Sequence, residues 1–75
     1  MSKVTVWSKP SCAQCNMAKA LLKSRGIEYE EKLIGSNGLT ADDLRAVAPS
    51  ARSVPQIFVD NSLLGGYTEL KAFLG

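Results

Sequence analysis

The chain contains no histidine and only two cysteines among its 75 residues. A closed tetrahedral zinc site needs four ligands, usually Cys or His, so this chain alone supplies half a set. Apolar runs stay far below the roughly 20 residues that a membrane-spanning helix needs. The net charge of +2 is too small to indicate nucleic-acid binding. We therefore expect no metal held by this chain alone, no membrane span and no nucleic-acid partner.

The N-terminus also lacks the apolar core of a signal peptide, so a cytoplasmic location is the default expectation. In a reducing cytosol a lone CxxC is more often catalytic or metal-binding than structural. A length of 75 residues, 45% hydrophobic and 21% charged, is typical of one small globular domain, which we expect to span 1–75. Nothing indicates an obligate oligomer, and we expect a monomer.

The two cysteines, Cys12 and Cys15, lie between a strand-like run and a helix-like run. By itself a CxxC can be half of a zinc site, can form a structural disulfide, or can occur by chance. In this context the first sulfur stands at a helix N-terminus, where the partial positive charge favours thiolate over thiol. Cysteines at i and i+3 in a first helical turn can also approach disulfide geometry. The sequence therefore predicts a redox pair in which Cys12 attacks and Cys15 resolves.

Hydrophobic periodicity and turn residues divide the chain into seven elements. Thr40 caps the second helix, with Asp43 three residues on as a variant capping box. Asp60-Asn61 forms a tight turn, and Thr68 caps the last helix. The predicted elements are a strand at 4–7, a helix at 13–25, a strand at 27–33, a helix between Thr40 and Pro49, strands at 56–59 and 62–64, and a helix at 68–74.

This order, βαβαββα, predicts an α/β fold with a four-stranded mixed sheet flanked by three helices, because a βαβ unit is parallel and a hairpin antiparallel. Apolar residues at helical spacing mark the side of each helix that we expect to be buried. Trp7 and Phe58 are read as core or groove-lining aromatics. The expected buried positions are Met17, Ala18, Leu21 and Leu22 in the first helix, Leu44, Val47 and Ala48 in the second, and Leu70, Phe73 and Leu74 in the third.

The order of elements, with CxxC after the first strand, resembles the thioredoxin fold in its minimal form. Three further signals are similar to the glutaredoxins. Lys9-Pro10 stands just before the CxxC, and Ser53-Val54-Pro55 resembles the Thr-Val-Pro element before the third strand. The run from Gly65 to Leu70, GGYTEL, resembles the Gly-Gly turn and polar pair before the last helix. The resemblance spans nearly the whole chain.

One departure concerns the residues between the cysteines. The family usually has Pro-Tyr there, and this chain has Ala13-Gln14. A glutamine before the second cysteine is similar to the glutaredoxin-like hydrogen donors of ribonucleotide reductase, which take electrons from thioredoxin reductase. That reductase-linked role is one alternative. An iron–sulfur cluster shared between two chains, with Cys12 and glutathione as ligands, is an alternative of another class.

The resemblance implies a glutathione-dependent thiol–disulfide oxidoreductase, with Cys12 as nucleophile and Cys15 as resolving thiol. Glutathione would be reductant and co-substrate, and no tightly bound cofactor is implied. The implied partners are disulfide-bearing or glutathionylated proteins, with ribonucleotide reductase as a candidate.

The resemblance also implies where glutathione binds. Lys9 would contact a carboxylate, and a cis-Pro55 would leave the backbone of Val54 free to pair with an extended substrate. The start of the last helix would bind a second carboxylate. Lys9, Gln14 and Glu69 have plainer readings as surface or capping residues, and Arg52 is a weaker candidate. The full set implied for glutathione is Lys9, Gln14, Val54, Pro55, Gly66, Tyr67, Thr68 and Glu69.

Overall fold

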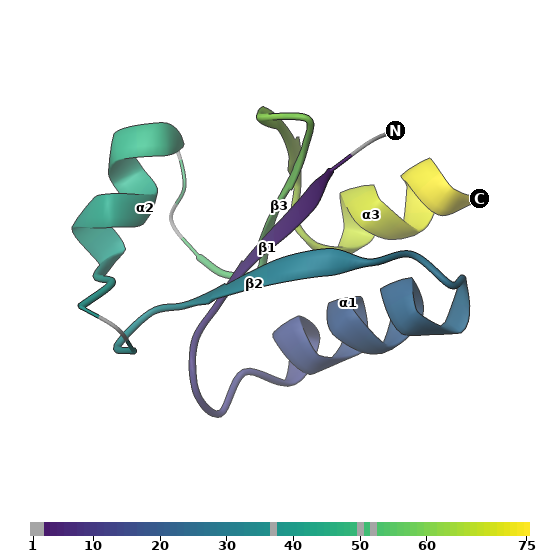
Figure 1. The fold of residues 1–75 in the computed structure, drawn as a ribbon, viewed down its shortest axis with the longest axis horizontal. Helices are drawn as coiled ribbons and strands as arrows, with labels where there is room; N and C mark the ends of the chain where they lie inside the picture. Colours follow the sequence, from purple (N-terminus) through teal and green to yellow (C-terminus); the bar gives the residue numbers. More distant parts are fainter. Residues whose placement is uncertain (1–2, 37, 50, 52) are drawn as a thin grey trace.

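The computed structural model describes residues 3–36, 38–49, 51 and 53–75. Within these ranges no helix is both long enough and apolar enough to cross a membrane. The elements follow the predicted order (Figure 1). They are β1 (Val4–Ser8), α1 (Ala13–Ser24), β2 (Tyr29–Leu33), α2 (Ala41–Val47), β3 (Gln56–Val59), β4 (Ser62–Gly65) and α3 (Tyr67–Leu74).

The four strands form one mixed sheet in the order β2-β1-β3-β4. Strand β1 pairs in parallel with β2 and antiparallel with β3, and β4 pairs antiparallel with β3. Val6 at the centre of β1 lies opposite Glu31 on one side and Ile57 on the other. The predicted α/β architecture, with a parallel βαβ unit and an antiparallel hairpin, is therefore confirmed.

The helices cover both faces of the sheet, with α1 and α3 on one face and α2 on the other (Figure 1). Successive residues of a strand point to opposite faces, so β1 contributes to two hydrophobic clusters. The cluster under α1 and α3 contains Val4, Val6, Ala18, Leu22, Ile57 and Leu70. The cluster under α2 contains Trp7, Leu44, Ala48 and Phe58.

Several local signals have the predicted geometry. The Thr40 hydroxyl accepts the Asp43 N–H at 3.3 Å, and the Asp43 carboxylate accepts the Thr40 N–H at 2.8 Å, which completes the capping box. Asp60 and Asn61 have φ values of 50° and 69°, as a two-residue hairpin turn of the primed type requires. Gly26 follows α1 with a φ of 68°. Short-range chemistry therefore determines these helix ends and turns.

Three residues that we expected to be buried are exposed: Met17 is 48% exposed, Val47 55% and Phe73 59%. In α1 the buried line is Cys15, Ala18 and Leu22, and Met17 lies about 100° of helical rotation from Ala18. Within α2 only Leu44 is buried and within α3 only Leu70, so Val47 and Phe73 lie outside the buried side of these short helices. For these three positions the prediction is wrong, because periodicity identifies an apolar face and not what covers it.

Several boundaries also differ from the prediction. The ends of β1, α1 and β4 each differ by one residue, and the starts of β2 and α3 differ for reasons that the structure shows. Strand β2 begins at Tyr29, and Ile27 donates its N–H to the Leu22 carbonyl at 3.0 Å, so it closes the end of α1 instead of joining the sheet. Helix α3 begins at Tyr67 with Gly66 as its N-cap, so the predicted cap at Thr68 is wrong. Glu69 supplies the carboxylate that accepts the Gly66 N–H at 2.7 Å.

Candidate active site

The loop between β1 and α1 presents Cys12 beyond the C-terminal end of β1, an inner strand of the sheet. Ser11 has a φ of 61°, in the left-handed region that few residues other than glycine adopt. Cys12 then returns to extended backbone and is the N-cap of α1. The chain thus changes direction within one residue, and the first turn of the helix begins directly behind the Cys12 sulfur.

Cys12 and Cys15 form a disulfide, with their Cα atoms 5.2 Å apart. Cys15 is fully buried under α1, whereas Cys12 is half-buried. A substrate sulfur can therefore reach Cys12 and not Cys15. The accessible thiol is the one that must attack, and the buried one is placed to resolve.

The surroundings of Cys12 favour negative charge on its sulfur. The Cys15 N–H points to the Cys12 Sγ at 3.2 Å, and a hydrogen bond to a charged acceptor is stronger than one to a neutral acceptor. The first turn of α1 carries no acidic residue. The helix N-terminus therefore acts on this sulfur without an opposing carboxylate nearby on the helix.

A second loop faces the Cys12 sulfur from the start of β3. The Val54–Pro55 peptide bond is cis, as the resemblance implied. Pro55 is buried, and the Val54 carbonyl oxygen lies 3.8 Å from the Cys12 Sγ. The packing of the sheet therefore brings the backbone of Val54 against the redox sulfur across 42 residues of sequence.

The start of α3 closes on the same loop. A Cβ added at Gly66 would lie 3.3 Å from the Pro55 carbonyl oxygen. Gly65 has a φ of 135°, and a Cβ there would overlap the Glu69 side chain. Two glycines are needed because one backbone position is left-handed and the next passes close to another backbone. The first N–H groups of α3 consequently lie beside the cis-proline loop.

Lys9 and Val54 share a cavity of about 190 Å³ with Ser53 and with residues of α2. One of these is Arg45, which also pairs with Asp42 one turn earlier in α2. The sequence analysis did not single out Arg45, because only tertiary packing brings α2 beside the loop that carries Lys9. Two cations, Lys9 and Arg45, therefore line the cavity next to Val54. We call this cavity, together with the backbone around Cys12, Val54 and Gly66, the groove.

Comparison with known proteins agrees with this geometry. Residues 4–64 match the sequence model of the glutaredoxin family. A probable glutaredoxin of Synechocystis sp. is 34% identical over 74 residues, covering 99% of this chain and 84% of that protein. The chain belongs to the glutaredoxin family. Glutaredoxin 3 of Escherichia coli is 37% identical over 73 residues, covering 96% of this chain and 86% of that protein.

Solved glutaredoxins have the same fold. Glutaredoxin 1 of Francisella tularensis superposes with a TM-score of 0.84 at 27% identity, and the match covers 99% of this chain and 93% of that one. Membership of the glutaredoxin family, together with the Cys12–Cys15 disulfide, identifies the chain as a thiol–disulfide oxidoreductase.

The remaining candidate residues of the glutaredoxin site are less closely gathered. Gln14 lies on the exposed side of the first turn of α1. Tyr67 is half-buried and packs against the cluster under α1 and α3. Thr68 is exposed at the second position of α3. Arg52 lies outside the described residues.

Ser8, Lys19 and Glu31 form a polar cluster beneath α1 that the sequence did not predict. Ser8 is fully buried, and its hydroxyl donates to Glu31 Oε2 at 2.6 Å. The Lys19 ammonium donates to the same oxygen at 2.7 Å. These two donors hold the pKa of the Glu31 carboxyl below its ordinary value of 4.5, against the weaker opposing effect of burial. The cluster joins the last residue of β1 to α1 and β2, just before the loop that carries Cys12.

Proposed function

We propose that this glutaredoxin uses glutathione as its reductant and acts on glutathionylated and disulfide-bearing proteins. The observation that carries the proposal is the set of groups that adjoin Cys12 and Val54. Its sulfur faces the Val54 backbone at 3.8 Å, and Val54 lines the same cavity as Lys9 and Arg45. On the other side, the start of α3 at Gly66 approaches Pro55.

Glutathione matches this groove in chemistry and order. It has a carboxylate at each end and two amides between. Lys9 and Arg45 would bind one carboxylate, and the free N–H groups at Tyr67 and Thr68 would bind the other. The Val54 backbone would pair with the central cysteine as a short strand does. Pro55 would hold the Val54 backbone in place for this pairing. Gln14, in the first turn of α1, would contact the bound glutathione thiol.

Glu69 has a smaller role in this proposal than the resemblance implied. Its carboxylate already accepts the Gly66 N–H at 2.7 Å. The structure therefore gives Glu69 a capping contact, and any contribution to the glutathione ammonium would come from its second oxygen.

The reaction would proceed by two thiol–disulfide exchanges. The Cys12 thiolate attacks the glutathione sulfur of a mixed disulfide, so a Cys12–glutathione bond forms while the protein thiolate leaves and takes up a proton. A second glutathione thiolate then attacks the bound glutathione sulfur and releases Cys12 and oxidised glutathione. In the dithiol route the Cys12 thiolate attacks a protein disulfide and releases the first protein thiolate. Cys15 then attacks the Cys12 sulfur and expels the second protein thiolate, and two molecules of glutathione reduce the resulting Cys12–Cys15 disulfide and leave as oxidised glutathione. Exchange rates follow the thiolate fraction and the accessibility of each sulfur.

The proposal needs no tightly bound cofactor. Its natural setting is a reducing cytoplasm in which the glutathione pool recharges Cys12 and Cys15, and the chain would act there as a monomer. Ribonucleotide reductase is a candidate among the disulfide substrates. Neither an iron–sulfur cluster nor recharging by thioredoxin reductase is needed to account for the groove.

The test is a coupled assay in which NADPH oxidation reports turnover of a glutathionylated peptide. One arm contains glutathione and glutathione reductase, and the other contains thioredoxin reductase alone. We expect turnover in the first arm and little in the second. Efficient turnover with thioredoxin reductase, and none with glutathione, would replace the proposal with the reductase-linked role.

Lys9→Ala tests the groove itself. Because the Lys9 side chain is exposed, we expect the KM for the glutathionylated peptide to rise about threefold to tenfold, between the values for exposed and for partly desolvated charge contacts. Lys71→Ala, which removes a lysine from the last turn of α3, is the matched control and should leave the KM unchanged. Equal KM values for the two variants would remove Lys9 from the site.

A further inference from the structure

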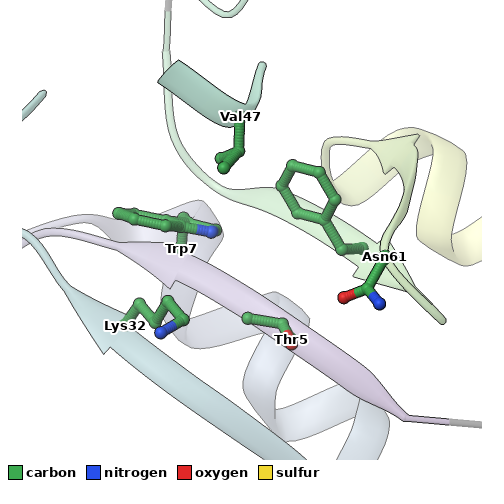
Figure 2. A pocket seen from close by; sticks show the side chains of 6 residues that line it. Thr5, Trp7, Lys32, Val47 and Asn61 are labelled. Atoms are coloured by element: carbon green, nitrogen blue, oxygen red, sulfur yellow. The ribbon is translucent and has the colours of Figure 1, made fainter. Parts of the chain in front are cut away.

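A second cavity lies on the α2 face of the sheet, away from the cysteines. Helix α2 has only seven residues and covers part of this face. Beside it the surface is hollowed to a volume of about 410 Å³ (Figure 2). We call this hollow the α2-face pocket. It is lined by Thr5, Trp7, Lys32, Val47, Phe58 and Asn61.

Three apolar side chains form the centre of the α2-face pocket. Trp7 and Phe58 are only 5% and 7% exposed, and both belong to the cluster under α2. Val47 comes from the last turn of α2 and points toward Trp7 across the opening (Figure 2). Its exposure of 55%, which the periodicity of α2 did not predict, is accounted for by its place at the rim. A flat apolar body would lie against the exposed edges of an indole and a phenyl ring.

Three polar groups stand around this apolar centre. Lys32 is the one charged residue among the described residues that line the pocket. Its ammonium lies 5.7 Å from the centre of the Trp7 ring, within the range of a cation–π contact. Thr5 and Asn61 line the opposite end and carry a hydroxyl and an amide (Figure 2).

The carboxylate of Glu30 lies near the Lys32 ammonium without forming a hydrogen bond to it. The Glu30 carboxylate is 3.8 Å from the Lys32 ammonium, beyond hydrogen-bond distance, and it is also 4.0 Å from the Lys3 ammonium. Asp60, at the adjacent turn, accepts the Lys3 backbone N–H. The donors of Lys32 are thus available to an anion that enters beside Trp7.

We propose that the α2-face pocket binds a small planar apolar molecule that carries one anionic group, such as an aromatic carboxylate or sulfonate. The rings would lie against Trp7 and Phe58, and the anion would contact the Lys32 ammonium. The volume is within the 300–1,000 Å³ typical of small-molecule sites, and a few placed polar groups around an apolar wall are their usual composition. A stable protein partner would need about 800 Å² of surface on each side, which this compact hollow does not offer. The site is separate from the cavity of Lys9 and Val54, because the two cavities share no lining residue.

The chain contains a single tryptophan, so the fluorescence of Trp7 reports directly on this pocket. The oxidised protein is titrated with 8-anilino-1-naphthalenesulfonate and, in parallel, with neutral N-phenyl-1-naphthylamine, which lacks only the sulfonate. We expect saturable, one-to-one quenching of Trp7 by both dyes, with tighter binding of the sulfonate. The absence of saturable quenching would refute the site.

Three variants separate the α2-face pocket from unspecific dye binding. Lys32→Met should weaken the sulfonate about twofold to fivefold, as for a partly exposed charge contact, and leave the neutral amine unchanged. Val47→Gln should weaken both dyes about threefold or more, because it removes apolar contact at the rim. Phe73→Gln alters an equally exposed apolar residue on the opposite face and should change neither.

Each departure from this pattern has a defined meaning. If Phe73→Gln weakens the dyes and Val47→Gln does not, the dyes bind on α3 and the proposal is wrong. If Lys32→Met weakens both dyes equally, the preference for an anion is wrong. Dye binding that all three variants leave intact reflects unspecific adsorption and overturns the site.

Discussion

Replacement of Glu31 by alanine should cost this small domain a large part of its stability. The Glu31 carboxylate is the acceptor for the fully buried Ser8 hydroxyl at 2.6 Å and for the Lys19 ammonium at 2.7 Å. Without it, the hydroxyl keeps its place under α1 and loses its acceptor. A buried donor left without a partner costs about 1–3 kcal/mol.

The ion pair adds less. The side chains of Lys19 and Glu31 are 22% and 33% exposed, so solvent screens their attraction and its share is about 0.5–1 kcal/mol. Together the two losses come to roughly 1.5–4 kcal/mol. A natural domain of this length is stable by only about 4–11 kcal/mol. The variant should remain folded with a clearly lower urea midpoint.

Urea unfolding of oxidised protein at pH 7 measures this loss. Glu28→Ala, which removes an exposed carboxylate before β2, is the matched control and should change the free energy of unfolding by less than about 0.5 kcal/mol. In the double variant Ser8→Ala/Glu31→Ala, no donor is left unpaired, so its loss should be smaller than the sum of the two single losses. Additive losses, or a Glu31→Ala effect no larger than the control, would refute the reasoning.

The pH dependence gives an independent check. The folded-state pKa of Glu31 is lowered from 4.5 by Lys19 and Ser8, so folding favours the ionised carboxylate. This contribution is fully present above about pH 4.5 and is lost as the pH falls through the lower folded-state pKa. The stability difference between wild type and Glu31→Gln should therefore be constant from pH 6 to 8 and shrink on acidification below about pH 4.5. A difference that grows on acidification would contradict the assignment.

Three further predictions concern the redox site. Cys12→Ser should abolish all disulfide exchange, whereas Cys15→Ser should keep deglutathionylation and lose reduction of protein disulfides; equal loss in both assays would contradict the assigned roles. Iodoacetamide alkylation of Cys12 against pH should have its midpoint below the roughly 8.5 of a free cysteine, and a midpoint near that value would remove the electrostatic argument. Gln14→Glu should raise this midpoint by a few tenths of a unit while raising the melting temperature, because a carboxylate in the first turn opposes the thiolate and favours the helix; a lower midpoint would show that the added carboxylate does not act on Cys12.

The elements and their local chemistry can be predicted from the amino-acid sequence alone. The Thr40–Asp43 capping box, the Asp60-Asn61 turn and the CxxC at the junction of strand and helix each depend on residues a few positions apart. Their geometry follows from short-range hydrogen bonds and backbone preferences, which a linear pattern records. The order of these elements was then enough to predict the mixed sheet, since connection length limits how strands can pair.

The packing of the helices decided the rest, because a periodic apolar face does not say which part of it a neighbour will cover. Val47 and Phe73 have the spacing of core residues and are exposed, since α2 buries only Leu44 and α3 only Leu70. Arg45 lines the cavity of Lys9, and Glu31 accepts a hydrogen bond from the buried Ser8. Both contacts join elements that are far apart in the sequence, so they form only in the folded structure. Such contacts depend on how the helices pack on the sheet. This packing is determined by the shape complementarity of many side chains, and a local sequence pattern does not contain that information.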